Sequence, residues 1–297
     1  MNSSPGLRFF PYRPAAWLLV RGADAASYLQ GQFSQDLREI HGGKVAYGLW
    51  LNGKGKIIAD SFVGEGPEPG EFWVGSYFCP AAEVQRRLEE YIVADEVEVA
   101  DATSEWQGLA VLGPGAGAWA AAAAAPGAVA FPGRRAAGEA WELLWPESAS
   151  AAMGPRLGTI AAGGAGELER ERIAAGIPAI PRDAGPADLP PEADLAAAAI
   201  SYTKGCYTGQ EVIARLKTRG RVRRRLRRVR GAGPAPAVPA PLWCGEKKAG
   251  ELRSAVGAAA PGEFLGLAMV TADFPADAAL GFAADADPAA AAVRFCV

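Results

Sequence analysis

Short apolar runs separated by polar turns fill the first hundred residues. Four of these runs have the length of β-strands: 16–20, 44–51, 56–63 and 71–77. Asn52-Gly53 lies between the second and third runs and is a strong signal for a β-hairpin. Residues 80–92 are predicted to form a helix, because Val84 and Leu88 recur at helical spacing.

The same mixture of elements continues to residue 216. Further strands are predicted at 96–99, 109–112, 128–131 and 141–145. One helix is expected around Trp119, and another from Glu167 to Ala175, ending at Gly176. Alternating short strands and helices predict an α+β fold with mixed or antiparallel sheets, in two halves that meet near residues 101–106.

Residues 217–297 have a different pattern. Strand candidates at 240–244 and 264–270 are separated by Gly, Pro and Ala, which fits a small C-terminal β-barrel. Residues 231–241 are predicted to be a stiff loop. We therefore expect three domains: 1–103, 104–216 and 217–297.

The most informative stretch is the octet Lys-Gly-Cys-Tyr-Thr-Gly-Gln-Glu at residues 204–211. Thr208 and Glu211 have the spacing of a capping box, so a helix is predicted to begin there. Cys206 then lies just before a helix N-terminus, where the helix dipole and the charge of Lys204 both favour a thiolate. A small buried cysteine in a tight turn is the alternative, and composition supports the two interpretations equally.

Two glycines favour the reactive thiol. Gly205 and Gly209 flank the cysteine region and permit backbone shapes that other residues resist. Such positions are typical where a backbone closely approaches a ligand or another strand, so both glycines are candidate site residues.

Composition describes an ordinary globular protein and excludes several chemistries. Hydrophobic residues make up 50% of the chain and charged residues 21%, and no apolar run is long enough to predict a membrane span. Residues 1–10 have neither a secretory nor a transit-peptide pattern, so a cytoplasmic location is expected. With 4 cysteines lacking a Cys-x-x-Cys spacing and His41 as the single histidine, neither a disulfide framework nor a His-rich zinc site is expected.

Basic residues are concentrated between Arg215 and Arg230. This stretch holds 10 of the 30 Arg and Lys residues and no acid, so the rest of the chain, with 20 basic and 33 acidic residues, has a net charge of −13. A basic patch on an acidic body predicts local contact with an anionic partner. The alternative is a solvated face with Val222, Leu226 and Val229 inward, a spacing closer to that of a helix than a strand.

Three earlier segments and the octet together carry a family resemblance. In order along the chain, the earlier segments are LQGQFSQDL at 29–37, GKIIAD at 55–60 and RIAAGIP at 172–178. With the octet, they resemble the YgfZ family, folate-binding relatives of the glycine-cleavage T-protein. The resemblance implies two ferredoxin-like α/β halves followed by a C-terminal β-barrel.

The resemblance also implies a pocket for tetrahydrofolate or a one-carbon derivative. T-proteins carry an acidic pair near the folate on the strand that holds Asp60, and here Ala59 takes the place of the first acid. Tyr47 and Trp50, beside the predicted hairpin, are candidate walls for the pterin ring. Without the resemblance, Asp60 would be interpreted as an outward-facing or turn-capping acid.

Within the octet, Cys206 is the expected functional thiol, and Lys204 is expected to lower its pKa by charge. Tyr207 is a candidate pocket wall. Gln210 and Glu211 are candidates for hydrogen bonds across the domain junction, although a capping role alone would explain Glu211. An iron–sulfur cluster normally needs four ligands, so one cysteine could carry a cluster only with a partner or in a dimer.

The function that the family implies is that of a cytoplasmic accessory protein rather than a turnover enzyme. It would bind a reduced folate and assist iron–sulfur cluster assembly or repair with assembly or client proteins. One alternative is a T-protein-like aminomethyltransferase or another one-carbon transferase; Ala174, where such T-proteins carry a glutamate, argues against it. Another is an RNA-associated factor for tRNA modification that makes weak contact through Arg215–Arg230. No resident metal is expected.

Overall fold

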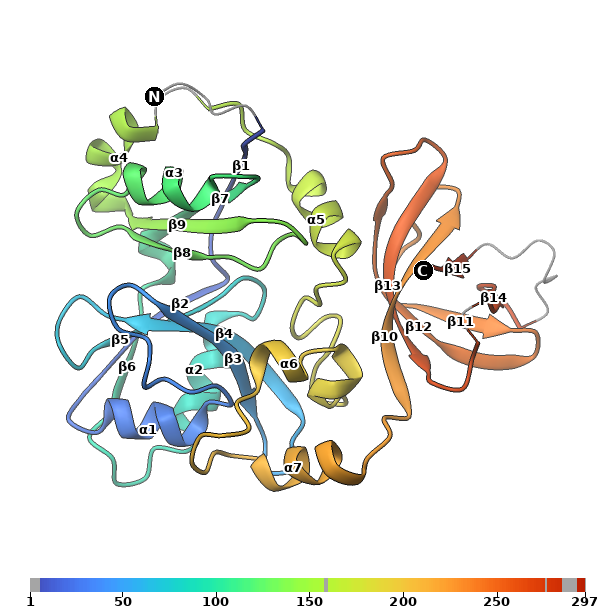
Figure 1. Ribbon diagram of the computed structural model, residues 1–297, viewed down its shortest axis with the longest axis horizontal. Helices are drawn as coiled ribbons and strands as arrows, with labels where there is room; N and C mark the ends of the chain where they lie inside the picture. Colours follow the sequence, from blue (N-terminus) through green and yellow to red (C-terminus); the bar gives the residue numbers. More distant parts are fainter. Residues whose placement is uncertain (1–5, 158–159, 276, 285–292, 297) are drawn as a thin grey trace.

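In a computed structural model, the described residues form three β-sheets. Two of the sheets, with their helices, are stacked on each other and are called the body below; the third forms a barrel beside this body (Figure 1). The structure describes residues 6–157, 160–275, 277–284 and 293–296, and it does not describe the Arg219 side chain. Parts of the N-terminal stretch 1–10 and of the expected barrel segment 217–297 therefore lie outside the described residues. Within those ranges, no helix is both long and apolar enough to cross a membrane.

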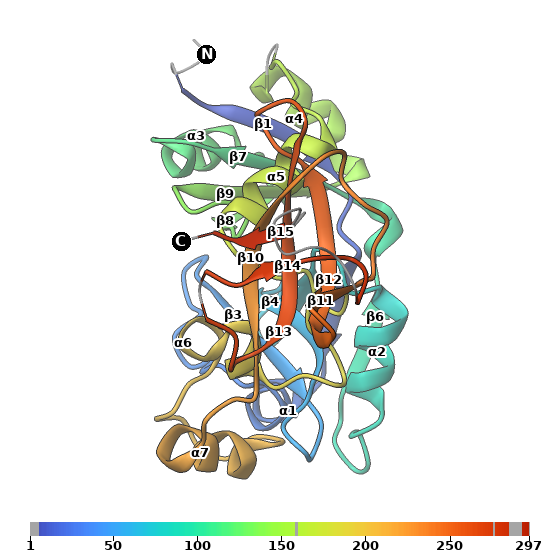
Figure 2. The same ribbon diagram turned by 90° about the vertical axis from the view of Figure 1, so that its right-hand side faces the viewer.

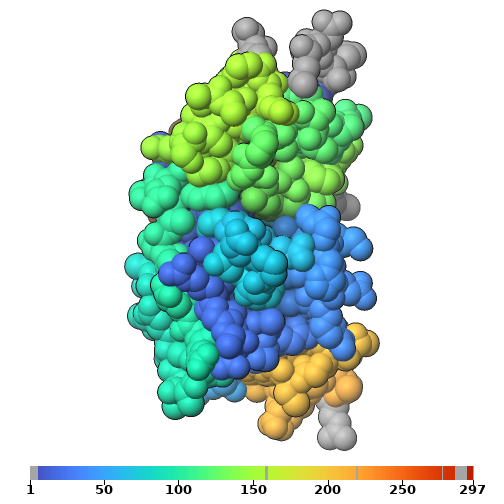
Figure 3. Space-filling model, turned by 90° about the vertical axis from the view of Figure 1, so that its left-hand side faces the viewer, coloured from blue at the N-terminus to red at the C-terminus, as the bar shows by residue number. Residues whose placement is uncertain are grey.

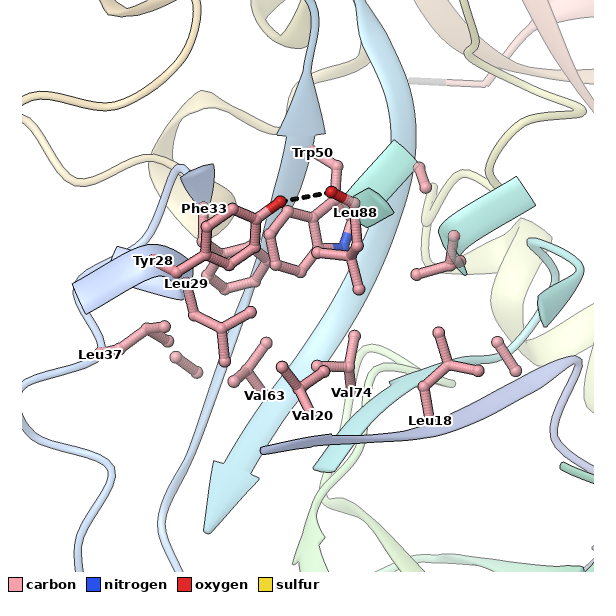
Figure 4. Close-up of a cluster of buried hydrophobic side chains, with 14 of the residues drawn as sticks. Leu18, Val20, Tyr28, Leu29, Phe33, Leu37, Trp50, Val63, Val74 and Leu88 are labelled. Atoms are coloured by element: carbon pink, nitrogen blue, oxygen red, sulfur yellow. Dashed lines mark hydrogen bonds between the residues drawn. The ribbon is translucent and has the colours of Figure 1, made fainter. Parts of the chain in front are cut away.

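The first sheet has the strand order β3, β4, β5, β2, β6, and its neighbouring strands are antiparallel. The strands are β2 (Ala16–Arg21), β3 (Val45–Leu51), β4 (Ile57–Glu65), β5 (Phe72–Ser76) and β6 (Glu98–Asp101). One face is covered by α1 (Ala25–Gln32) and α2 (Ala81–Glu89). Leu18 and Val74 of the sheet face Leu29 and Leu88 of these helices in a buried core (Figure 4). The hairpin, the strands and the helix predicted at 80–92 are confirmed.

The second sheet has the order β1, β7, β9, β8 and is also antiparallel. Its elements are β1 (Arg8–Tyr12), η1 (Thr103–Glu105), β7 (Trp106–Leu112), α3 (Ala116–Ala123), β8 (Val129–Pro132), β9 (Ala140–Pro146), η2 (Glu147–Ala149) and α4 (Ser150–Leu157). β1 was not predicted from the sequence. β1 pairs with β7, so the pairing joins residues on either side of the domain boundary proposed between 103 and 104. The boundary itself stays a prediction.

The chain then returns to the first sheet. After α5 (Ala165–Ala174) come η3 (Pro190–Ala193), α6 (Ala196–Ala199) and α7 (Gln210–Arg219). Leu195 and Tyr207 from this region pack with Leu49 and Ile57 of the hairpin. Because neighbouring residues of a strand point to opposite faces, this cluster lies on the face turned away from α1 and α2.

The third sheet forms a nearly closed barrel in the order β11, β12, β13, β10, β15, β14 (Figure 2). Its strands are β10 (Arg224–Ala232), β11 (Ala240–Cys244), β12 (Lys247–Gly257), β13 (Glu263–Thr271), β14 (Ala279–Leu280) and β15 (Val293–Phe295). A bridge between Trp243 and Gly281 links its two edges. The predicted barrel is confirmed. The helical spacing suggested for the basic stretch is wrong, because residues from Arg224 onward form β10.

Buried polar groups join the barrel to the body. Arg172 of α5 is only 1% exposed; it pairs with Asp183 at 2.7 Å and donates to the Ser254 hydroxyl of β12 at 3.0 Å. Asp188 pairs with Arg253 of β12 at 2.6 Å. The segment that follows α5 is thus fixed to the barrel by charged side chains removed from solvent.

Candidate functional site

Lys204 fastens the octet to the loop that follows α1. The residue is 5% exposed, and its ammonium group donates to the backbone carbonyls of Gln30, Phe33 and Gln35 at 2.6, 2.7 and 3.0 Å. Burial lowers the pKa of Lys204 to about 8. Three carbonyls take the three ammonium protons, so Lys204 acts as a structural clasp. Its effect on the Cys206 thiol stays a prediction.

Tyr207 and Gly209 press the octet against the β3–β4 hairpin. Tyr207 is buried beside Ile57, and burial raises its pKa to about 12. Gly209 has a φ of +83°, and a Cβ at this position would lie 2.7 Å from the Asn52 carbonyl oxygen. Gly209 therefore makes a close backbone approach, to the turn of the hairpin rather than to one of its strands.

Gly205 differs from Gly209. A Cβ built on Gly205 would meet nothing within 4 Å, and its φ lies outside the left-handed region. The expectation of a close backbone approach is wrong at this glycine. The contributions of both glycines to a ligand site stay predictions.

The predicted capping box is wrong. Helix α7 begins at Gln210 with Gly209 as its N-cap, and no side chain caps it. The Thr208 hydroxyl instead donates to Gln32 Oε1 of α1 at 3.0 Å, and the same oxygen accepts from Arg87 at 3.1 Å. A tertiary partner has displaced the local one. Glu211 is exposed in the first turn, where its charge suits the helix dipole.

Cys206 is exposed, whereas Cys79 is buried in the first core. The alternative of a small buried cysteine is therefore wrong. In sequence, Cys206 lies between Lys204 and Tyr207, whose side chains are both buried. These two side chains fix the turn on which the thiol is exposed to solvent. This combination makes a surface thiol on a fixed turn, which a partner molecule can reach.

Asp60 and Tyr47 meet inside the body. Asp60 is 4% exposed; its two carboxylate oxygens accept from the Ser76 and Tyr47 hydroxyls, each at 2.9 Å. Burial raises the pKa of the Asp60 carboxyl. The Arg134 guanidinium lies 4.2 Å from the centre of the Tyr47 ring. The interpretation of Asp60 as an outward-facing or turn-capping acid is wrong, and its contact with a folate stays a prediction.

Trp50 does not share this location. It is fully buried on the α1–α2 side of the sheet, where its ring packs on Phe33 and its indole nitrogen donates to the Ser61 hydroxyl at 2.8 Å (Figure 4). Tyr47 and Trp50 are three residues apart on β3 and so face opposite sides. Trp50 as a wall of the same pocket is therefore wrong.

An aromatic cavity of about 310 Å³ lies between β1, the end of β5 and α5. Its lining includes Phe10, Tyr12, Arg13, Tyr77, Phe78, Arg135, Leu168, Glu169 and Arg172. The sequence prediction missed this site, although Tyr77-Phe78 ends a predicted strand and an arginine pair follows Gly133. The Tyr77 backbone directly follows Ser76, so the cavity wall adjoins the group that bonds Asp60.

Arg135 is the most unusual group in that lining. The residue is 4% exposed, pairs with Glu142 at 3.2 Å, and stacks 3.5 Å from the centre of the Tyr77 ring. Its Nη2 atom has no hydrogen-bond partner among the described residues. A buried donor without a partner at a cavity is a candidate contact for a ligand acceptor.

The basic stretch lies mostly at the surface, and some of its arginines already have partners within the protein. Arg224 pairs with Asp188 and Glu192 at 3.0 and 3.2 Å, and Arg228 donates to the Ala174 carbonyl at 2.8 Å. Among the described side chains of the stretch, six arginines are exposed: Arg215, Arg221, Arg223, Arg225, Arg228 and Arg230. Lys217 of α7 lies 3.8 Å from the ring centre of the exposed Tyr202, just before the octet. In the part of the chain that the structure describes, no three His, Cys, Asp or Glu side chains form a metal-binding group.

The fold is that of a glycine-cleavage aminomethyltransferase. The crystal structure of glycine cleavage system aminomethyltransferase T from Bartonella henselae superposes with a TM-score of 0.72 at 18% identity, over 90% of this chain and 78% of that one. The family model of the GCVT N-terminal domain matches residues 13–131, and that of the CAF17 C-terminal β-barrel domain matches residues 223–293.

Comparison with proteins of similar sequence assigns the chain to one family with this fold. The tRNA-modifying protein YgfZ of Klebsiella pneumoniae is 30% identical over 75% of this chain and 71% of its own length, and that of Vibrio vulnificus is 30% identical over 82% and 75%. The human mitochondrial iron-sulfur cluster assembly factor IBA57 is 30% identical over 74% of this chain, but the match spans only 65% of the human protein. The chain belongs to the YgfZ family, which confirms the resemblance.

Proposed function

We propose that this chain binds a reduced folate and uses Cys206 in the assembly or repair of iron–sulfur clusters. The observation that carries the proposal is the exposed thiol of Cys206 on a turn fastened by the buried Lys204 and the close-packed Gly209. The human relative is named an iron-sulfur cluster assembly factor, which supports a function of this class.

The cluster would be cargo in this scheme. An iron–sulfur cluster is normally held by four thiolates, and Cys206 offers one. The other ligands would come from a partner protein that docks at the octet. A fixed, exposed turn suits such sharing, because the thiol does not need to be ordered when the partner arrives.

The aromatic cavity is the site proposed for the pterin ring of a tetrahydrofolate. Its aromatic side chains match a flat pterin ring, the free Nη2 of Arg135 matches an acceptor on that ring, and the Glu169 carboxylate can accept from a ring donor. Arg13 at the rim could meet the carboxylates of the glutamate tail. When bound, tetrahydrofolate supplies a carrier for one-carbon units. Asp60 lies directly behind this wall, bonded to Ser76.

The test of the thiol is Cys206→Ser in a cell that lacks the protein. This exposed substitution should leave folding intact and abolish complementation, because a hydroxyl cannot replace a thiolate ligand. Cys244→Ser and Cys296→Ser are the matched controls and should complement fully. Full complementation by Cys206→Ser would contradict the central role of the thiol.

Calorimetry with tetrahydrofolate tests the pocket. Micromolar binding is expected, about −8 kcal/mol. Phe78→Ala should weaken it by about 1 kcal/mol through loss of an aromatic wall, whereas Tyr202→Ala, outside the cavity, should not. If Asp60→Asn weakened the binding of tetrahydrofolate and Phe78→Ala did not, the pterin would be assigned to a site beside Asp60 instead of the aromatic cavity. Absence of any binding heat or competition with reduced folates would refute folate binding altogether.

An RNA-associated function is the second candidate, favoured by the exposed pair of Lys217 and Tyr202 beside the octet. An aromatic ring and nearby cations suit an unpaired nucleotide. Changing Arg221, Arg223 and Arg225 to Glu, and sparing the ion-paired Arg224, should reduce RNA binding and its dependence on salt. If this variant bound RNA as tightly as the parent chain, the basic stretch would be excluded as the RNA-binding surface. One-carbon transfer stays a weaker alternative because of Ala174.

A further inference from the structure

A groove of about 710 Å³ lies between α1 and the turn that joins β4 to β5. The turn is cyan in Figure 3 and lies next to blue surface from the first fifty residues. The apolar lining consists of a floor formed by Leu37, Ile40 and Phe72, which are buried or half-buried, and of the exposed Ala26 and Pro67 on the walls. Neither Cys206 nor the aromatic cavity belongs to this lining, so the groove is separate from the proposed folate and thiol sites.

The rim of the groove is acidic. Four glutamates lie along it and along the adjoining hollow of about 570 Å³: Glu65, Glu68, Glu71 and Glu96. The two arginines in these linings are already paired, Arg38 with Asp36 at 2.6 Å and Arg21 with Glu98 at 2.7 Å. Neither arginine therefore neutralises the four glutamates. Glu65 lies 3.3 Å from the His41 imidazole in the same lining, and Glu68, Glu71 and Glu96 have no ion-pair partner among the described residues.

One wall of the groove is bonded directly to the octet. Gln30 lines the groove, and its backbone carbonyl accepts the hydrogen bond from Lys204 at 2.6 Å. The Gln30 side chain also accepts from the Leu37 amide at 2.9 Å and donates to Asp36 at 3.1 Å. A shift of this wall would therefore move the clasp, which lies two residues from Cys206.

We propose that the groove docks a basic, amphipathic segment of a partner protein, and that docking is transmitted through Gln30 and Lys204 to Cys206. The apolar floor receives the apolar side of the segment, and the glutamates meet its Lys and Arg residues. The chain outside the basic stretch, with its net charge of −13, attracts such a segment. Docking itself rests only on the groove, whereas the coupling rests on the function proposed for Cys206.

A short amphipathic peptide of leucine and lysine is the probe, with a leucine–glutamate peptide of the same pattern as its control. Fluorescence anisotropy should detect binding of the first peptide only. Glu65→Gln combined with Glu68→Gln should weaken binding about fivefold. The matched control, Glu89→Gln with Glu90→Gln at the end of α2, removes the same charge elsewhere and should leave the affinity unchanged. Equal weakening by both pairs would mean nonspecific attraction and would overturn the docking site.

A steric variant separates the groove from general charge. Ala26 is exposed on the groove wall, and Ala26→Trp should fill the space and abolish binding, whereas Ala118→Trp on the exposed side of α3 should not. Peptide binding that survives Ala26→Trp would also overturn the proposal. Concentration-dependent self-association that the glutamate variant breaks would assign the groove to a second copy instead.

The coupling is measured at the thiol. In a chain with Cys244→Ser and Cys296→Ser, saturating peptide should change the alkylation rate of Cys206 by about fivefold. An unchanged rate with bound peptide would refute the coupling and leave the docking intact. Both outcomes are independent of complementation by Cys206→Ser, so this proposal and the function of the thiol can fail separately.

Discussion

The octet and the barrel are joined to the same body by different chemistry. At the octet, the single buried cation of Lys204 is shared among three neutral backbone carbonyls. At the barrel, Arg172 meets the full charge of Asp183, and Arg253 meets that of Asp188. Loss of Lys204 leaves only carbonyl dipoles unpaired at the octet, whereas loss of Asp183 leaves the buried charge of Arg172 matched by Glu169 alone, at 2.7 Å. The barrel junction should therefore be the more sensitive of the two.

Within the octet, the residues that anchor the turn differ from those that are accessible to solvent. Lys204, Tyr207 and Gly209 are buried or closely packed, whereas Cys206 and Glu211 are exposed. The motif thus joins structural anchors to one accessible reactive group. At the barrel junction, Asp183 and Arg172 are both buried and pair with each other, and Arg172 also pairs with Glu169.

The largest expected effect is that of Asp183→Ala. Asp183 is fully buried and also accepts from the Ala179 amide at 2.8 Å and from the Ser254 hydroxyl. Its removal leaves these two buried donors without their acceptor and leaves Arg172 with Glu169 as its remaining carboxylate, at 2.7 Å. We expect the free energy of unfolding to fall by about 3–5 kcal/mol in urea titrations. Glu98→Ala breaks an exposed pair with Arg21 and should cost less than about 1 kcal/mol. Equal losses in the two variants would contradict a buried-charge junction.

A smaller loss is expected from Lys204→Met. The variant removes three hydrogen bonds from a buried ammonium but leaves no ion behind, so the free energy of unfolding should fall by about 2–3 kcal/mol. Lys217→Met on the exposed side of α7 is the control and should change it by less than about 0.5 kcal/mol. If Lys204→Met were as stable as the control, the clasp would not hold the octet.

The paired glycines sharpen the same contrast. Gly209→Ala should cost about 2 kcal/mol, because a Cβ is disfavoured at φ +83° and would press on the Asn52 carbonyl. Gly205→Ala has open space and should change stability by less than about 0.5 kcal/mol. Thermal unfolding of the two variants side by side measures the difference. Similar costs at both positions would refute the assignment of one glycine as an anchor.

Most of the fold could be predicted because its signals are local. The Asn52-Gly53 turn and the apolar runs on either side sufficed for the β3–β4 hairpin. β1 was missed because Phe9 and Phe10 form a short run that ends at Pro11, and its partner strand β7 lies far along the chain. β10 was obscured because arginines occupy most of its positions, which hides the alternation of a strand.

Less of the candidate site could be predicted, because its contacts join distant segments. Lys204 bonds a carbonyl 174 residues earlier, and no local pattern reveals that partner. Arg224 resembles its neighbours in sequence, yet it alone of the central arginines pairs with Asp188. The placement of Trp50 could have been predicted, since residues three apart on a strand face opposite sides.

The smallest expected effect is a pH dependence at the octet. Burial lowers the pKa of Lys204 to about 8, from an ordinary value of 10.5 that the unfolded chain retains. Between these pH values the unfolded state binds more protons, so the contribution of this group to stability rises with pH and is lost as pH falls to 8. The stability difference between the parent chain and Lys204→Met should thus grow by about 1 kcal/mol, once solvent screening is allowed for. Urea titrations of both proteins across this range give the difference, in which the titration of tyrosines and other lysines cancels. A constant difference would mean that the clasp stays protonated throughout, and that the three carbonyls outweigh the cost of burying the charge.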